Sequence, residues 1–157
     1  MQKFIVFGMI KSLHDLFTAL WVGGILTTAI SLLPAVRKSG LKPAVFNSLN
    51  EQYQRRLRVV ALVSIVGLWI TGILLGRQSA AFSGFMNFAT TYETLISVKH
   101  LLIIAMVGIA VVRGFILGRN TSSATLPQRK LSMGLLLINS ILGVVVIFLS
   151  GISATLG

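Results

Sequence analysis

The chain contains two histidines, His14 and His100, and each lies beside a charged residue at the edge of an apolar stretch. His14 precedes Asp15 and the apolar run that follows it, and His100 follows Lys99 shortly after a later run begins. Ionisable residues at the edge of a membrane span are costly unless another group pairs with them or ligates them. Two neutral imidazoles on facing helices are suitable axial ligands for six-coordinate haem iron. The pattern therefore predicts a metal centre shared by His14 and His100, with b-type haem as the first choice.

The elements that position these histidines are four apolar runs of about 20 residues, the length needed to cross the hydrocarbon core of a membrane. The runs cover residues 16–36, 59–76, 95–117 and 131–156. The chain has 157 residues, 55% of them hydrophobic, and a mean hydropathy of +0.90, which is not typical of a soluble domain. Backbone groups in lipid must be satisfied internally, so runs of this length indicate helices. We expect a single all-α domain, a four-helix membrane bundle with helices over 4–36, 55–76, 93–117 and 131–156.

The formal net charge of +11 is concentrated in two of the three loops. Lys and Arg crowd residues 37–58 and 113–130, whereas the middle loop has only Arg77 at its start and Glu93 at its end. Short loops rich in Lys and Arg stay on the cytoplasmic side. We therefore expect a multi-pass protein of the cytoplasmic (inner) membrane with both termini outside. The partner of the basic excess is then anionic lipid rather than nucleic acid.

In this topology His14 and His100 fall at similar depth in the outer third of the membrane. Lys11, Lys99 and Arg77 lie at the same end, where their charges would neutralise haem propionates. Trp21 follows His14 by seven residues, so it lies on the same helix face. It is expected either to pack against a macrocycle or to serve ordinary helix packing. For the histidines, the alternative is that each one only caps a helix or forms a hydrogen bond at the membrane interface.

Copper is the alternative metal. Copper(I) prefers Cys and Met ligands, but the chain has no cysteine, which also excludes disulfides. Met9 and Met106 lie five and six residues from the nearest histidine, so on a helix both point away from it. Two histidines remain as a weak copper site, and no ladder of methionines is visible.

Five further features of the sequence predict local structure. Asn139, near the middle of the fourth run, is expected to hydrogen-bond a neighbouring helix rather than a cofactor. Gly72 and Gly76 have the spacing that lets two membrane helices approach closely. Pro34 is expected to end or bend the first helix. Residues 78–91 are expected to form an apolar segment at the outer interface, and residues 120–130 a polar linker.

The stretch LHDLFTALWVGGILTTAISLLPAVR, residues 13–37, resembles the first helix of CopD-type copper-resistance membrane domains. The shared features are the histidine, the W-x-G-G motif and a proline thirteen residues after the tryptophan. Thr71-Gly72 and Tyr92-x-x-Leu95-x-x-x-Lys99 fit the same pattern. The resemblance implies a four-helix membrane unit associated with copper handling, with His14 and Lys99 at family positions. His100 lies outside that pattern and favours haem.

The chain also resembles HemJ-type protoporphyrinogen oxidase, a small four-helix membrane protein that binds haem. His14 and Lys99 look like its His and Lys. Its Pro-Arg after the first-helix tryptophan and its C-terminal Asn-Glu motif are missing here, which weakens the implication of an enzyme.

Taken together, these features favour an electron-carrying b-type cytochrome that exchanges electrons with a quinone and an outer redox acceptor. Three alternatives stay open: copper binding or transport, protoporphyrinogen oxidation, and a structural subunit of a larger membrane complex or homo-oligomer.

Overall fold

The computed structural model describes residues 2–40, 42–78, 88–117 and 125–156. Over these ranges the chain is helical, without β-strands, which confirms the predicted all-α class. The helices are α1 (Gln2–Thr27), α2 (Leu33–Lys38), α3 (Pro43–Gln78), α4 (Thr91–Leu117) and α5 (Leu126–Ala154), and the π-helical segment η1 (Thr28–Leu32) joins α1 to α2. The segments predicted for the second and third loops lie largely outside the described residues, at 79–87 and 118–124.

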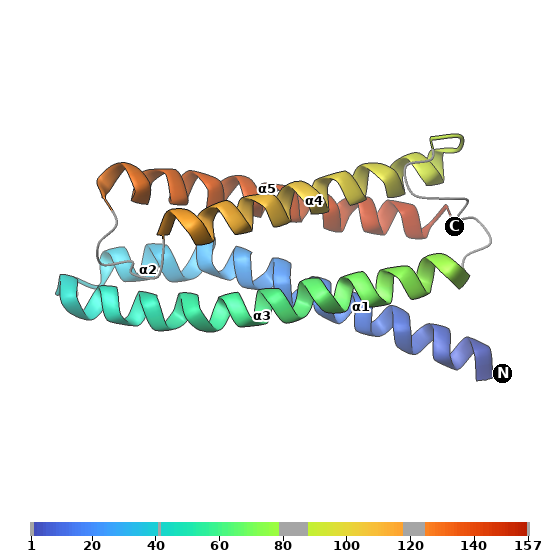
Figure 1. The fold of residues 1–157 in the computed structure, drawn as a ribbon, viewed down its shortest axis with the longest axis horizontal. Coiled ribbons are helices and arrows are strands. Elements are labelled where there is room, and N and C mark those ends of the chain that lie inside the picture. The colour runs from blue at the N-terminus through green and yellow to red at the C-terminus, as the bar shows by residue number, and fades with distance from the viewer. Residues whose placement is uncertain (1, 41, 79–87, 118–124, 157) are drawn as a thin grey trace.

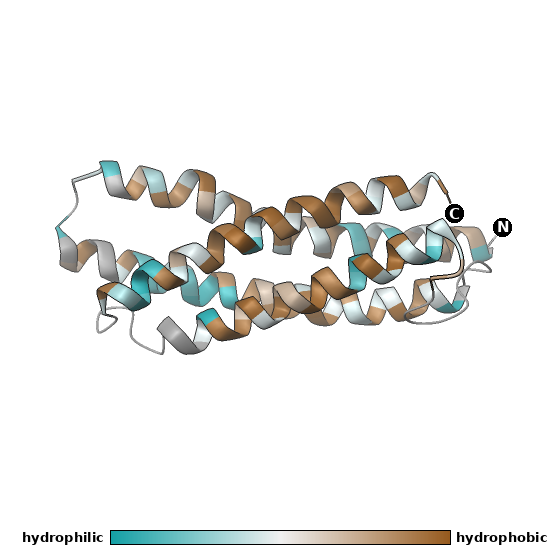
Figure 2. Ribbon diagram, turned by 90° about the horizontal axis from the view of Figure 1, so that it is seen from above, coloured by the Kyte–Doolittle hydropathy of each residue, from teal (hydrophilic) through white to brown (hydrophobic). Residues whose placement is uncertain are grey.

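Four helical stretches are long and apolar enough to cross a membrane, as the hydropathy pattern predicts. They cover Lys3–Val36, Ser48–Arg77, Thr91–Gly114 and Leu126–Ala154. Large apolar side chains such as Ile30, Leu62 and Phe148 are exposed along their outer faces. Figure 2 shows hydrophobic residues along the length of the helices and hydrophilic ones gathered mainly around the end where α3 begins. Exposed apolar surface of this extent is expected of helices that face lipid.

The helices form two antiparallel hairpins, α1 with α3 and α4 with α5 (Figure 1). Contacts between α1 and α5 join the two hairpins. The N- and C-termini lie at the same end of the bundle, and α2 and the start of α3 lie at the other end. The side of the membrane on which the termini lie stays a prediction from the charges of the loops.

The first membrane helix continues through Pro34 instead of ending there. Pro34 lies in the first turn of α2, and the turn before it is π-helical. Within a regular α-helix a proline ring clashes with the carbonyl group four residues earlier, here that of Ile30. The wider π-helical turn accommodates the ring, so the chain stays helical from η1 into α2.

The second membrane helix begins at Pro43, twelve residues before the predicted start at 55. Residues 43–54, which the predicted bounds leave between the first two helices, are therefore helical. The polar residues among them, such as Ser48, Asn50 and Glu51, interrupt the apolar pattern without interrupting the helix. The turn between α2 and α3 includes Gly40, whose φ of 63° is a conformation that glycine adopts without strain.

The buried side of α5 follows a seven-residue repeat. The positions that repeat at alternating steps of four and three are Ser132, Leu136, Asn139, Gly143, Val146, Ser150 and Ser153, all buried or half-buried. This is the spacing of a helix that packs against its neighbours along its whole length in a left-handed supercoil. Most of these residues are small, so α4 and α1 approach α5 closely. At Gly143, an added Cβ would lie 2.8 Å from Val22 of α1.

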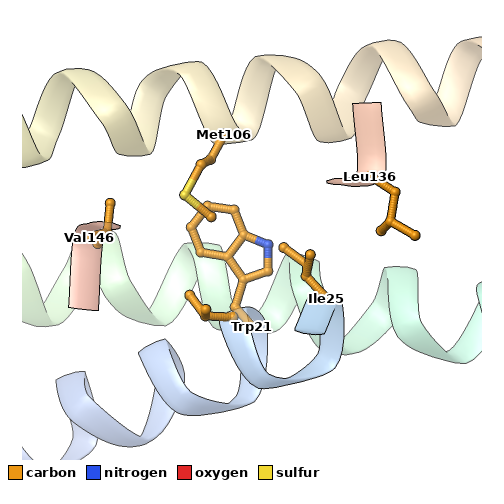
Figure 3. Packing of buried hydrophobic residues seen from close by; sticks show 6 residues of the cluster. Trp21, Ile25, Met106, Leu136 and Val146 are labelled. Atoms are coloured by element: carbon orange, nitrogen blue, oxygen red, sulfur yellow. The ribbon is translucent and has the colours of Figure 1, made fainter. Parts of the chain in front are cut away.

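The apolar core is small and lies where α1, α4 and α5 meet. It consists of Trp21, Val22, Ile25, Met106, Leu136 and Val146. Met106 is fully buried, and its side chain reaches from α4 to the Trp21 indole (Figure 3). The buried core side chains described come from α1, α4 and α5, and α3 adds Ala61, Ile65 and Leu68, which are partly buried and pack against them.

Small residues line the face of α3 that packs against α1. The buried positions of α3 are Ser64, Gly67 and Thr71. The Phe17 ring of α1 lies over Gly67, and a Cβ there would overlap it. At Gly72, one of the two glycines predicted to allow a close approach, a Cβ would be 3.6 Å from His14, an ordinary contact. The tightest approach on this helix is therefore at Gly67.

A hydrogen bond joins the same two helices near their other end. The Thr28 hydroxyl donates to the Gly24 carbonyl at 2.6 Å and lies 2.9 Å from the Tyr53 hydroxyl. Because the Thr28 proton is used on the carbonyl, Tyr53 donates to Thr28. Thr28 is completely buried, so this bond links α3 to η1 in the interior.

We expect Gly67→Ala to destabilise the protein, because the added methyl group must displace the Phe17 ring. Overpacking of this kind costs about 1–3 kcal/mol. The measurement is thermal unfolding in detergent, with Gly108→Ala as the matched control, since nothing lies within 4 Å of a Cβ at Gly108. The control should be neutral or slightly stabilising, because alanine favours a helix. Equal effects at both positions would contradict the packing described at Gly67.

We expect Tyr53→Phe to lower stability by about 1 kcal/mol, the usual size of a hydrogen bond between membrane helices. Thr28→Val should have an effect of similar size, and the double variant should add little to either single change. A double-mutant cycle of unfolding free energies measures this coupling. Additive effects would show that the two hydroxyls do not stabilise each other.

Candidate functional site

His14 is half-buried on α1 and is held by a side chain of α3. Its Nδ1 lies 2.8 Å from Thr71 Oγ1. The Thr71 hydroxyl is itself 2.6 Å from the Gly67 carbonyl, to which it donates its proton. Thr71 Oγ1 is therefore the acceptor, and His14 Nδ1–H is the donor. In the neutral imidazole this leaves the lone pair on Nε2.

His100 has the same proton arrangement by a different route. Its Nδ1 lies 2.7 Å from the carbonyl oxygen of Ile96, one turn earlier on α4. A carbonyl oxygen only accepts, so Nδ1 carries the proton and the lone pair of the neutral ring is again on Nε2. Histidines that bind metals usually donate their other ring N–H to such an acceptor, which sets the tautomer and the orientation of the ring. Both histidines meet this condition.

Charged groups from α1 and α4 come together around these rings. His14 is close enough to Asp15, Lys99 and His100 for their charges to interact with its own. Lys99 likewise interacts with Asp15. The tertiary structure thus brings His14 and Lys99 near each other, although 85 positions separate them in the chain.

The other predicted site residues differ in burial and in their distance from the two histidines. Lys99 is half-buried, whereas Lys11 and Arg77 are exposed. Trp21 lies about 10 Å along α1 from His14, at 1.5 Å per residue, in the core beside Met106 (Figure 3). Trp21 therefore has an ordinary packing role in the folded chain, and contact with a macrocycle stays a prediction.

The two histidines suit a cofactor that supplies most of the ligands of its own metal better than they suit a bare metal ion. Among the described residues, no three His, Cys, Asp or Glu side chains are grouped so that they could hold a metal ion. A bare copper ion would therefore have two imidazoles and no further ligand of these types. Haem supplies four equatorial nitrogens to its iron and needs at most two axial ligands from protein. The two Nε2 lone pairs fit that requirement.

A second polar site, which the sequence did not reveal, lies toward the opposite end of the bundle. It is a cleft whose polar lining consists of Gln54, Arg58, Arg113 and Asn139. The side-chain Oδ1 and Nδ2 of Asn139 are buried without a hydrogen-bond partner among the described residues. The prediction that Asn139 hydrogen-bonds a neighbouring helix is therefore wrong. Asn139 is instead one of the residues that line the cleft.

Arg113 also differs from the expectation based on charge. It was predicted as one of the basic residues beside the third loop, yet its Nε is buried and lacks a partner in the described part of the chain. Arg113 is thus half-buried, whereas a residue that only sets topology is expected to be exposed to water. No pattern in the sequence distinguishes Arg113 from the basic residues around it.

Neither a protein-family model, nor a curated protein, nor a solved structure matches this chain.

We expect ¹⁵N NMR of histidine-labelled protein to show His14 protonated on Nδ1. In Thr71→Val, the Nδ1–H loses its acceptor and the ring should shift toward a mixture of tautomers. Thr71→Ser keeps the hydroxyl and serves as the control. The chain has only two histidines, so a His100→Gln sample assigns the signals. A proton on Nε2 of His14 in the unchanged protein would contradict this assignment.

Proposed function

We propose that the chain is a membrane b-type cytochrome that holds haem through His14 and His100 and transfers electrons. One observation carries the proposal: both imidazoles donate Nδ1–H to an acceptor within the protein. Their Nε2 lone pairs are thereby prepared for iron. A histidine that only formed a hydrogen bond at the membrane interface would not require this tautomer at both positions.

In this proposal each residue has a defined task. His14 and His100 would hold the haem iron, and the Thr71 hydroxyl and the Ile96 carbonyl orient their rings. Lys99 is half-buried, its charge interacts with His14, and it would supply a positive charge for a haem propionate. The bound haem iron would supply the one-electron chemistry, cycling between its ferric and ferrous states.

The surroundings of the two histidines suit electron transfer better than catalysis on a substrate. The chain has three carboxylate side chains in total, and Asp15 is the one whose charge interacts with His14. The candidate site lies in the part of the bundle that contains both termini, so a haem there would be near one membrane surface. From the loop charges we propose that this surface is the outer side of the cytoplasmic membrane. A quinone and an outer redox protein are the proposed electron partners.

The resemblance to CopD-type domains and to HemJ-type oxidases includes His14 and Lys99, which are close in space. We retain copper binding or transport as the alternative function that the resemblance implies. Protoporphyrinogen oxidation and a structural role in a membrane complex are further alternatives. The two-histidine donor set supports haem over copper, because among the described residues copper would lack a third His, Cys, Asp or Glu ligand.

The test is the absorption spectrum of the purified protein in detergent, oxidised and then reduced with dithionite. We expect the sharp reduced α-band of low-spin haem and its loss or conversion to high spin in His14→Ala and in His100→Ala. His14→Met keeps an axial donor of another kind and should shift the spectrum instead of abolishing it.

Met106→Leu is the control, since methionine is the other common axial ligand and Met106 is buried in the core. Its spectrum should be unchanged. A colourless protein with stoichiometric copper would contradict the haem proposal and support the alternative. A normal spectrum in both histidine variants would show that these residues are not the ligands.

A further inference from the structure

The cleft at the opposite end of the bundle combines all four long helices. The second half of α1 contributes Leu20, Trp21 and Ile25, and α3 contributes residues between Gln54 and Ala61. α4 and α5 complete the lining with Ala110, Arg113, Gly114 and Asn139. The site is thus separated from His14 by nearly two helical turns of α1.

The charge of the lining is positive and uncompensated within the cleft. Arg58 and Arg113 both line it, and none of the lining residues is an Asp or a Glu. Arg113 Nε is buried and lacks a hydrogen-bond partner in the ranges that the structure describes. A guanidinium group in this state is best satisfied by an anionic oxygen, and phosphate oxygens fit its planar set of donors.

Asn139 provides an independent indication of a ligand. It is 1% exposed, and neither its amide nitrogen nor its carbonyl oxygen has a partner among the described side chains and backbone. Buried polar groups are nearly always hydrogen-bonded, so an unpaired carboxamide that lines a cleft marks the position of a polar group from outside the chain. The amide donates through Nδ2 and accepts through Oδ1, which suits a ligand with both ester and hydroxyl oxygens.

The remaining walls are apolar. Leu20, Trp21, Ile25 and Leu57 lie along α1 and α3 within the segments that are able to cross a membrane. A hydrocarbon chain therefore fits the apolar walls, and an anionic oxygen fits the two arginines. A small soluble anion would leave the apolar walls uncovered, and a neutral quinone would leave the two positive charges unpaired.

We propose that this cleft binds one acidic phospholipid, with its phosphate at Arg113 and Arg58 and its glycerol oxygens at Asn139. The acyl chain lies along Leu20 and Leu57, which are the exposed and half-buried large apolar residues of the lining. The inference does not depend on haem, because none of these residues belongs to the His14 and His100 group. The same phosphate chemistry is available from free phosphate, so the experiment includes it as a separate arm.

The test compares phosphatidylglycerol with phosphatidylcholine of identical acyl chains, added to the full chain in detergent. Native mass spectrometry measures the bound lipid, and thermal unfolding measures stabilisation. We expect one tightly bound phosphatidylglycerol, at least tenfold preferred over phosphatidylcholine, and a larger rise in Tm. Arg113→Gln should abolish the preference, and Asn139→Leu should weaken it.

Arg77→Gln is the matched control, since it removes one exposed arginine at the other end of the bundle and should keep the preference. If Arg113→Gln does not fold, Arg58→Gln tests the same prediction from an exposed residue of the cleft. Equal binding of the two lipids, or a preference that survives Arg113→Gln and Arg58→Gln, would overturn the proposal. Equal stabilisation by inorganic phosphate would also overturn it, because the site would then take a free anion.

The absorption spectrum recorded on the same samples separates this proposal from the proposed function. Lipid selectivity without haem would leave the cleft proposal intact and overturn only the cytochrome proposal. A haem spectrum without lipid selectivity would do the reverse.

Discussion

The close approach of α1 and α3 is the constraint on which the candidate site depends. Lipid offers no hydrophobic drive for helices to associate, so they are held by close packing and by hydrogen bonds between them. The α3 face toward α1 is therefore built from Ser64, Gly67 and Thr71 rather than from large apolar residues. Phe17 lies over Gly67, and one turn further His14 reaches Thr71. A bulkier residue at Gly67 would separate the helices and remove the histidine from its partner.

The same arrangement of hydrogen bonds occurs twice along this interface. Thr71 donates to the carbonyl of Gly67, and Thr28 donates to the carbonyl of Gly24, in each case one turn earlier. Each hydroxyl oxygen is then left as an acceptor for the neighbouring helix, from His14 in one case and Tyr53 in the other. In a membrane, where water does not compete for hydrogen bonds, such a threonine gives its helix an acceptor oxygen that points toward the neighbouring helix. At His14 that acceptor also determines the tautomer, which links the packing to the proposed chemistry.

The interior has two polar regions with different chemistry, separated by the core around Trp21 and Met106. One contains two imidazoles whose Nε2 lone pairs suit a metal, and the other contains two arginines and an unpaired Asn139 amide. Trp21 and Met106 belong to the apolar core between these regions, and Trp21 also contributes to the lining of the cleft.

Hydropathy and length determined the four long helices from the sequence, because a span of lipid requires an apolar run whatever lies beside it. Composition likewise reduced the metal-ligand candidates to His14 and His100. Helix period could not determine which neighbour each face meets, so the hydrogen bond from His14 to Thr71 and the Phe17 contact at Gly67 required the tertiary structure. The same limit explains why the surroundings of Asn139 and Arg113 were not predicted. A polar residue within an apolar run has the same sequence pattern whether it meets a hydrogen-bond partner or lines a cleft. The predicted and observed helix boundaries differ most at Pro43, the start of α3. The first part of this helix is polar, and hydropathy does not reveal a polar helix.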